Sequence, residues 1–263
     1  MSGQIIDLHG WFNTPAGRYL LTWEQAQVQR AVADIFGYHA LQLGLPVLDG
    51  LSANRMPHQW LADEEPAVTE SAEGRRIALV TQFAALPFPA SSIDMVVLPH
   101  TLEFCADSHG TLREVERVLV PGGKVVICGL NPTSLWGLRQ RRAHLYRRLG
   151  VGELFLPDGG AFLGYWRLRD WLRLLSFEVE TETFGCYRPS FQSQTWLERF
   201  EWMDSLGSRW WPIFGASYFL VAVKRVRGMH LLASPWKSTK VRAARSIPVA
   251  NRKGESCKVE TTD

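Results

Sequence analysis

Residues 86–129 read LPFPASSIDMVVLPHTLEFCADSHGTLREVERVLVPGGKVVICG, and this stretch decides the fold. Ile93–Leu98 is a short apolar run bounded by turn residues, which is typical of a strand buried on both faces of a parallel sheet. From Thr111 onward, apolar residues recur at helical spacing with charged residues between them, which predicts a surface helix. Pro121-Gly122-Gly123 cannot continue that helix and predicts a turn, and Lys124–Gly129 is a second apolar run. The stretch therefore predicts a strand, a crossover helix and a neighbouring strand, which together make a βαβ unit.

Outside this stretch the sequence predicts further strands of the same sheet. Apolar or alternating runs predict strands over 40–43, 58–62, 76–80, 177–184 and 217–223, and a helix over 168–175. The chain has 263 residues, of which 46% are hydrophobic, so it can bury a large core. These features predict one α/β domain with extensions.

The domain organisation follows from local composition. Residues 1–36 are predicted to form an N-terminal helical entry segment, with Thr22 opening a helix that runs to Ile35. Residues 37–228 are predicted to form the main domain, with an aromatic-rich and basic insertion over about 132–175. The last part, 229–263, combines Lys, Arg, Ser and Thr with little apolar content, which predicts a basic disordered tail.

Charge and cysteine content limit which binding partners and which cellular compartment we expect. The net charge of +3 is too small to demand a polyanionic partner, so nucleic acid is not the favoured partner. The four cysteines are widely spaced without a paired metal-type spacing, which predicts reduced thiols and no metal site. The N-terminus lacks a basic region followed by an apolar stretch, and no run reaches the roughly 20 apolar residues of a membrane span. We therefore expect a soluble, cytoplasmic protein, and the sequence leaves its oligomeric state open.

The stretch 86–129 resembles the second half of class I S-adenosylmethionine-dependent methyltransferases of the type 11 branch. The resemblance rests on Leu86-Pro87-Phe88, on Asp94, and on the helix and turn that read RxxERVLxPGG. The chain is also similar to a bacterial group of uncharacterised methyltransferase-like proteins. The resemblance implies a Rossmann-like α/β sandwich with a mostly parallel seven-stranded sheet, an antiparallel last strand and helices on both faces. It also implies S-adenosylmethionine as the cofactor.

The resemblance assigns cofactor roles to residues at the ends of the predicted strands. In the family, the first strand ends in an acid and is followed by a glycine-rich loop; here Gln42 stands in place of the acid, Gly44 is kept and Pro46 replaces a second glycine. The acid that binds the ribose hydroxyls in the family corresponds to Asp63, with Glu64 as the alternative. The implied cofactor residues are Gln42, Gly44, Asp63, Gln82, Phe83, Leu98 and Pro99.

Two residues after the fourth strand have competing interpretations. His100 lies where class I enzymes often place residues over the transferring methyl group, so it is either a catalytic general base or a loop histidine that caps the strand. Glu103 either orients a substrate or, as we favour, is a solvated acid at a helix start. The arginine-rich segment over 139–148 either attracts a nucleic acid or an acidic substrate or, as we favour, forms a solvated face.

The resemblance implies transfer of a methyl group to a small or lipid-like acceptor. Two alternatives remain: a catalytically inactive binding or regulatory protein with the same fold, which Gln42 and Pro46 would explain, and, with less support, a nucleic-acid methyltransferase. A dehydrogenase of the Rossmann type is disfavoured because the Gly-x-Gly-x-x-Gly element is absent after the first strand.

Overall fold

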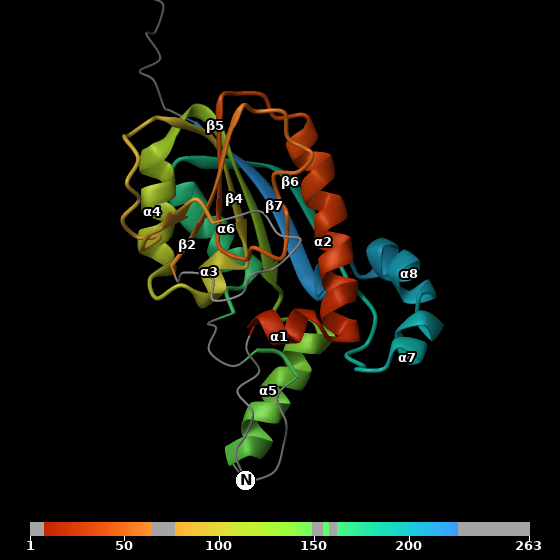
Figure 1. Cartoon of the computed structure of the whole chain (residues 1–263). Helices are drawn as coiled ribbons and strands as arrows, with labels where there is room; N and C mark the ends of the chain where they lie inside the picture. Colours follow the sequence, from red (N-terminus) through yellow and green to blue (C-terminus); the bar gives the residue numbers. More distant parts are fainter. Residues whose placement is uncertain (1–7, 65–76, 149–154, 158–161, 226–263) are drawn as a thin grey trace, which may run out of the picture. The chain divides into compact units, whose positions relative to one another are not determined.

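The computed structural model describes residues 8–64, 77–148, 155–157 and 162–225. The predicted basic tail over 229–263 lies outside these residues, and so does Arg76, the first residue of the predicted third strand. Figure 1 shows how the helices and strands of the described part of the chain are arranged.

The centre of the fold is one seven-stranded sheet with the order β3-β2-β1-β4-β5-β7-β6. The strands are β1 His39–Leu43, β2 His58–Asp63, β3 Leu79–Val80, β4 Ile93–Pro99, β5 Leu119–Leu130, β6 Phe177–Gly185 and β7 Ser217–Lys224. Neighbours from β3 to β5 pair in parallel, whereas β7 runs antiparallel to both β5 and β6. The prediction of a mostly parallel seven-stranded sheet with an antiparallel last strand is confirmed.

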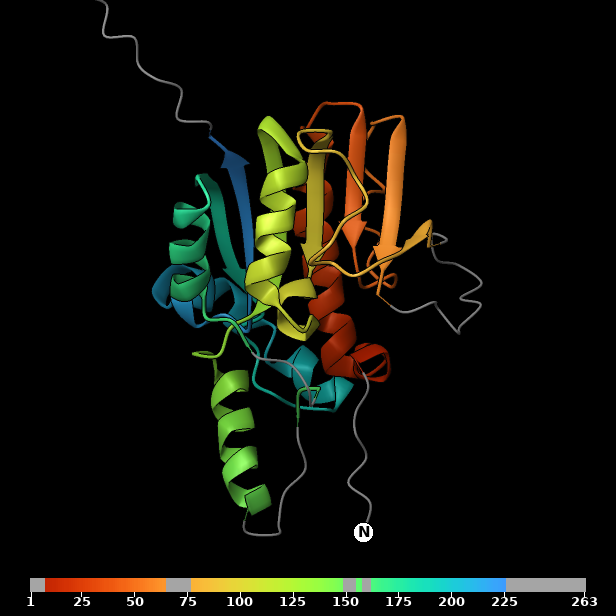
Figure 2. The same ribbon diagram turned by 90° about the vertical axis from the view of Figure 1, so that its left-hand side faces the viewer.

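Helices cover both faces of this sheet (Figures 1 and 2). In chain order they are α1 Leu8–Phe12, α2 Pro15–Ala33, α3 Thr101–Phe104, α4 Ser108–Val118, α5 Leu135–Arg148, α6 Tyr165–Leu174, α7 Gln194–Arg199, α8 Trp202–Trp210 and the 3-10 turn η1 Pro212–Phe214. Helix α2 packs on one face and contributes Leu20, Val28 and Val32 to the core there. Helices α4 and α6 pack on the other face, which builds a second core layer.

The helical entry differs from its prediction in one respect. We expected Thr22 to open the helix, but α2 begins at Pro15, with Thr14 as its N-cap. The side-chain oxygen of Thr14 accepts a hydrogen bond from the backbone N–H of Gly17, and Pro15 occupies a first-turn position where no N–H is needed. The cap at Thr14 therefore defines the helix start, and Thr22 lies inside the helix.

The segment between α4 and the end of β5 also differs from its prediction. Pro121-Gly122-Gly123 does not separate the helix from the strand as a free turn, because β5 runs through it with a register shift opposite β4. Gly122 has a φ of +82°, which an L side chain adopts only with strain.

Between β1 and β2, residues 44–57 form turns and bends without a helix, so an irregular segment covers this part of the sheet. No described helix is both long and apolar enough to cross a bilayer.

Candidate functional site

The carboxyl ends of β1, β2 and β4 meet at one edge of the sheet. Figure 2 shows these three strands pointing towards the same end of the molecule, where α1 and α3 also lie. In open α/β sheets, ligands bind in the crevice outside the carboxyl ends of the strands. The predicted cofactor residues lie at or just after the carboxyl ends of these strands and of β3, so the fold gathers them at the edge where such a site is expected.

Gly44 lies at the centre of this edge. It has a φ of +74°, and its backbone N–H donates to the carbonyl oxygen of Ala62 at 2.8 Å. A Cβ atom at this position would lie 3.6 Å from the ring of Phe83 and 3.6 Å from Oγ1 of Thr101. The hydroxyl of Thr101 donates to the carbonyl oxygen of Leu43. Residues that follow β1, β3 and β4 thus converge around one glycine.

Sequence reasoning identified Gly44 and Phe83 but missed Thr101. Thr101 is the first residue of a short helix after β4, and no motif in the sequence singles it out. Its hydroxyl ties that helix to the end of β1, so it helps to hold the two strand ends together.

Two carboxylates lie at the end of β2. Asp63 is half-buried, and its Oδ1 accepts from the backbone N–H of Glu64 at 2.8 Å. The exposed Glu64 accepts from the backbone N–H of Phe83 at 3.1 Å, so it links the end of β2 to the segment after β3. Gln82 is exposed beside them. Carboxylate oxygens at this position suit the two hydroxyls of a ribose, and an exposed amide suits a base edge, so these residues fit a nucleoside.

Gln42 organises the loop that follows β1. Its side chain is buried, and Nε2 donates to the carbonyl oxygens of Gly44, Leu45 and Leu48 at 3.2, 3.1 and 2.7 Å. Its Oε1 accepts from the backbone N–H of Gly50 at 3.0 Å. Both ends of the amide are therefore used inside the protein, and no charge stands at the position where the resembled family has an acid.

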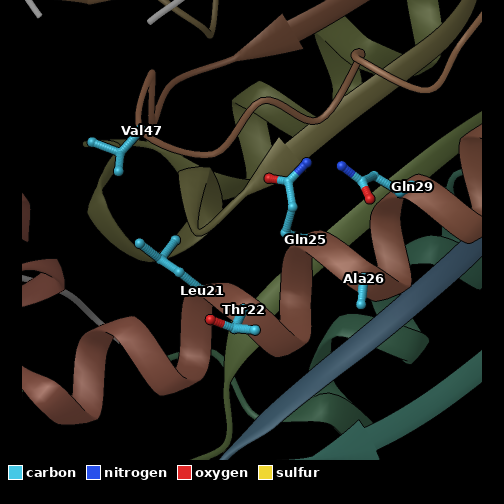
Figure 3. Close-up of a pocket in the computed structure, with 6 residues that line it drawn as sticks. All are labelled: Leu21, Thr22, Gln25, Ala26, Gln29 and Val47. Carbon is cyan, nitrogen blue, oxygen red and sulfur yellow. The ribbon is translucent and has the colours of Figure 1, made fainter. Parts of the chain in front are cut away.

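A cavity of about 440 Å³ lies beside this loop, between it and α2. In Figure 3, Leu21, Gln25 and Gln29 project from α2 towards the loop segment that carries Val47. The amide of Gln25 donates to the carbonyl oxygen of Asp49 at 2.7 Å, which attaches the loop to the helix. None of the predicted cofactor residues lines this cavity, so it is separate from the sheet edge around Gly44.

His100 is held inside the protein by two carboxylates. It is buried, with Nδ1 2.9 Å from Oε2 of Glu103 and Nε2 2.9 Å from Oε2 of Glu24. Burial alone would lower the pKa of His100, but the two carboxylates outweigh burial and raise its pKa to about 10. The ring is therefore an imidazolium at neutral pH, and it donates to both carboxylates.

The network extends beyond the histidine. Oε1 of Glu24 accepts from the hydroxyl of Ser217 at 2.6 Å, and Oε1 of Glu103 accepts from the backbone N–H of Leu130. Our expectation that Glu103 is a solvated acid is wrong, because its side chain is buried, and burial raises the pKa of Glu103. Glu24 and Ser217 were not identified from the sequence, although an acid between the buried Leu20 and Val28 on one side of α2 is a signal for a buried partner.

Helix α1 covers this network. The ring of Phe12 lies 5.7 Å from that of His100, and Nε1 of Trp11 donates to the carbonyl oxygen of Phe155 at 2.7 Å. Leu98 and Pro99, which precede His100, are also buried. Because the ring is an imidazolium with both nitrogens hydrogen-bonded, it can accept a proton from a substrate only after it has given up one of its own protons and exchanged that hydrogen bond. Its role as a catalytic base stays a prediction.

A comparison with known protein families identifies a methyltransferase domain over residues 60–127. Among curated proteins, the uncharacterized protein YafS of Escherichia coli (strain K12) is 32% identical over 170 residues. The aligned region is 64% of this chain and 65% of the E. coli protein, so the chain spans slightly less than two thirds of that relative.

Among solved structures, a chain in the complex between the Haloferax volcanii Trm112 methyltransferase activator and a methyltransferase superimposes with a TM-score of 0.54. It is 17% identical, and the match covers 85% of this chain and all of that chain. A methyltransferase from Thermotoga maritima, described as a possible histamine N-methyltransferase, gives a TM-score of 0.55 at 16% identity over 82% of this chain and 94% of that chain. At these identities the similarity establishes the fold.

Proposed function

Since the fold and the matched methyltransferase domain support the class I methyltransferase superfamily, we propose that this protein transfers a methyl group to a small or lipid-like acceptor. The superfamily implies S-adenosylmethionine as the cofactor. The observation that carries the proposal is the convergence of Gly44, Glu64, Phe83 and Thr101 at the carboxyl edge of β1, β2 and β4.

The residues at this edge fit the nucleoside part of the cofactor. We assign the ribose hydroxyls to Asp63, with Glu64 fixing the segment that carries Phe83. The ring of Phe83 can cover one face of the adenine, and the exposed Gln82 can pair with the edge of the base. Leu98 and Pro99 would act through the backbone at the end of β4, because their side chains are buried.

The cofactor supplies an electrophilic methyl group, so the protein itself needs no nucleophile. Its tasks are to position the acceptor and to exclude water. We infer that the network of His100, Glu24 and Glu103 holds the end of β4 in place beside the acceptor. In this proposal His100 is a positioning residue first, and a base only if the ring gives up a proton and an acceptor replaces one of its hydrogen bonds.

Calorimetric titration with S-adenosylhomocysteine, the demethylated product, tests the proposal. We expect micromolar binding, weakened about tenfold or more by Asp63→Ala, because hydrogen bonds to a charged group contribute about 1.5–3 kcal/mol. Glu178→Ala removes an exposed acid on β6 and serves as the control, for which we expect unchanged binding. A folded protein that shows no binding at millimolar ligand would refute the proposal.

One observation favours a second candidate, a binding protein without catalysis. The amide of Gln42 closes the loop after β1 on itself, and Pro46 within the loop has no N–H to offer a ligand. Incubation with S-adenosylmethionine labelled in its methyl group separates the two candidates once binding is established. Label in the lipid or small-molecule fraction of a cell extract supports transfer, whereas binding without any labelled product supports the second candidate.

A further inference from the structure

Helix α5 presents an uncovered apolar stripe to solvent. Leu135, Leu138 and Leu145 are 50%, 48% and 60% exposed, and Tyr146 beside them is 46% exposed. The spacing of the three leucines places them on one side of the helix. Figures 1 and 2 both show α5 extending from the end of the sheet, away from the helices that cover its faces.

The stripe is not needed to attach α5 to the protein. The opposite side of the helix does this, through the buried residues Trp136, Gln140 and Ala143. Oε1 of Gln140 accepts from the backbone N–H groups of Phe155 and Leu156 at 3.1 and 2.9 Å. A helix that is already anchored on one side has no structural reason to carry exposed leucines on the other.

The helix is also strongly basic. Its sequence, LWGLRQRRAHLYRR, contains five arginines and no acidic residue. Arg139, Arg141 and Arg142 are exposed. Among the described residues, no carboxylate forms an ion pair with Arg141 or Arg142. The uncovered stripe is therefore flanked by positive charge that the described residues do not neutralise.

A cavity of about 360 Å³ adjoins the base of this helix. Arg141 of α5 and Arg167 of α6 both line it, together with Thr133, Trp166 and Ile213, and none of its lining residues is acidic. Trp166 and Ile213 are 59% and 45% exposed, so apolar surface continues from the helix to the cavity. Two guanidinium groups that line one cavity suit the phosphate of a headgroup.

From these observations we propose that this surface docks the protein on an anionic phospholipid membrane. The docking face consists of Leu135, Leu138, Arg141, Arg142, Leu145 and Trp166. Leucines on one side of a basic helix insert into the boundary between headgroups and acyl chains, and arginines beside them contact lipid phosphates. Tryptophan is enriched at the same depth, because its ring is apolar and its N–H is polar.

The mixture of side chains favours a membrane over a nucleic acid. A nucleic acid would be bound by the arginines and by stacking on aromatic rings, but exposed leucines would gain nothing against phosphates. The docking does not depend on methyl transfer. It does agree with a lipid-like acceptor, because α5 follows β5 at the edge of the sheet where Gly44 lies.

Co-sedimentation of the full-length protein with vesicles tests the inference. We expect binding to vesicles of phosphatidylcholine mixed with phosphatidylglycerol, weaker binding to phosphatidylcholine alone, and a decrease as salt rises. Leu138→Ser/Leu145→Ser should weaken binding to the mixed vesicles about tenfold, since less apolar area is buried. Arg141→Ser/Arg142→Ser should weaken binding and reduce its dependence on salt.

The matched control is Leu174→Ser/Arg113→Ser, which removes one exposed leucine and one exposed arginine away from the docking face. It should bind as the wild type does. All variants change exposed residues, so an unchanged thermal midpoint confirms that they fold. The inference is overturned if the wild type does not co-sediment with anionic vesicles, or if it binds RNA and not the vesicles. It is also overturned if the leucine variant binds as well as the wild type, because binding then belongs to another part of the chain.

Discussion

At the scale of single residues, the side chain of Gln42 determines the conformation of the loop after β1. A carboxylate at this position could not donate to the carbonyl oxygens of Gly44, Leu45 and Leu48, whereas the amide donates to all three. The loop after β1 is thus built around an amide, and the acid typical of the resembled family does not fit it.

These hydrogen bonds predict the effect of the isosteric change Gln42→Glu. The carboxylate would face three carbonyl oxygens in a buried position, so we expect the free energy of unfolding to fall by about 2–4 kcal/mol. Urea denaturation measures the change. Gln192→Glu, at an exposed position before α7, is the control and should stay within about 0.5 kcal/mol of the wild type. Equal stability of both variants would mean that the amide does not hold the loop.

The buried histidine predicts a pH dependence of stability. The pKa of His100 is about 10 in the folded protein and 6.5 ordinarily, so protonation favours the folded state. The contribution is complete below pH 6.5 and is lost as the pH rises from 6.5 to about 10. The difference in unfolding free energy between the wild type and His100→Gln should therefore shrink across this range.

Denaturant titrations of both proteins at several pH values provide the measurement. Groups away from this network titrate alike in both proteins, so their effects cancel in the difference. His58→Gln, at an exposed position on β2, is the control and should show a small difference throughout. A difference for His100→Gln that stays constant or grows with pH would contradict the assignment of a buried imidazolium.

Some candidate site residues could be predicted from local sequence patterns, and others could not. Gly44 and Phe83 could be placed because they follow strands that the sequence reveals. Thr101, Glu24 and Ser217 could not, because their roles depend on contacts between segments that are distant in the chain, such as Glu24 with Ser217. A hydroxyl or a carboxylate that acts only through such contacts leaves no local pattern.

At the scale of elements, α2 and its N-cap illustrate a boundary that the sequence alone misplaced. Thr14 and Thr22 are both threonines near the helix start, but only the hydroxyl of Thr14 accepts a hydrogen bond from the N–H of a first-turn residue. The hydroxyl of Thr22 instead donates back to the carbonyl oxygen of Arg18 within the helix. The apolar periodicity revealed that a helix exists, but two similar residues competed for its cap.

The two threonines give a direct comparison. Thr14→Ala should lower the unfolding free energy by about 1 kcal/mol, because the first turn loses its cap. Thr22→Ala should change the unfolding free energy by no more than about 0.5 kcal/mol. Alanine is a better helix former, and the only hydrogen bond lost is the one from the Thr22 hydroxyl to the carbonyl oxygen of Arg18. Thermal unfolding of the two variants ranks them. The reverse order would place the effective helix start at Thr22.

Strands were more predictable than connections. Apolar runs located β1, β2, β4, β6 and β7 to within two residues, because buried strands are continuous stretches that the pattern shows directly. The irregular connection after β1 was not predictable, because the hydrogen bonds of a single buried amide stabilise it. The same holds for the path of β5 through Pro121-Gly122-Gly123, where pairing with β4 on both sides of the glycines overrides the local turn signal.

At the scale of the whole described part, the class I pattern that residues 86–129 resemble implies a mostly parallel seven-stranded sheet with an antiparallel last strand, and the structure confirms this sheet. The sheet order brings residues that are far apart in sequence to one edge. The same edge carries the start of α5, so the candidate cofactor site and the docking face lie at one end of the sheet. The proposed function therefore depends on the cofactor binding at this edge of the sheet.

Hydrogen–deuterium exchange measured by mass spectrometry, with and without S-adenosylhomocysteine, tests this claim most directly. We predict slower exchange in peptides that cover 42–50, 61–64 and 81–84, which surround Gly44. We predict no change over 21–29, the part of α2 that lines the other cavity. Protection confined to 21–29, or no protection at saturating ligand, would contradict a cofactor site at the carboxyl edge of the sheet.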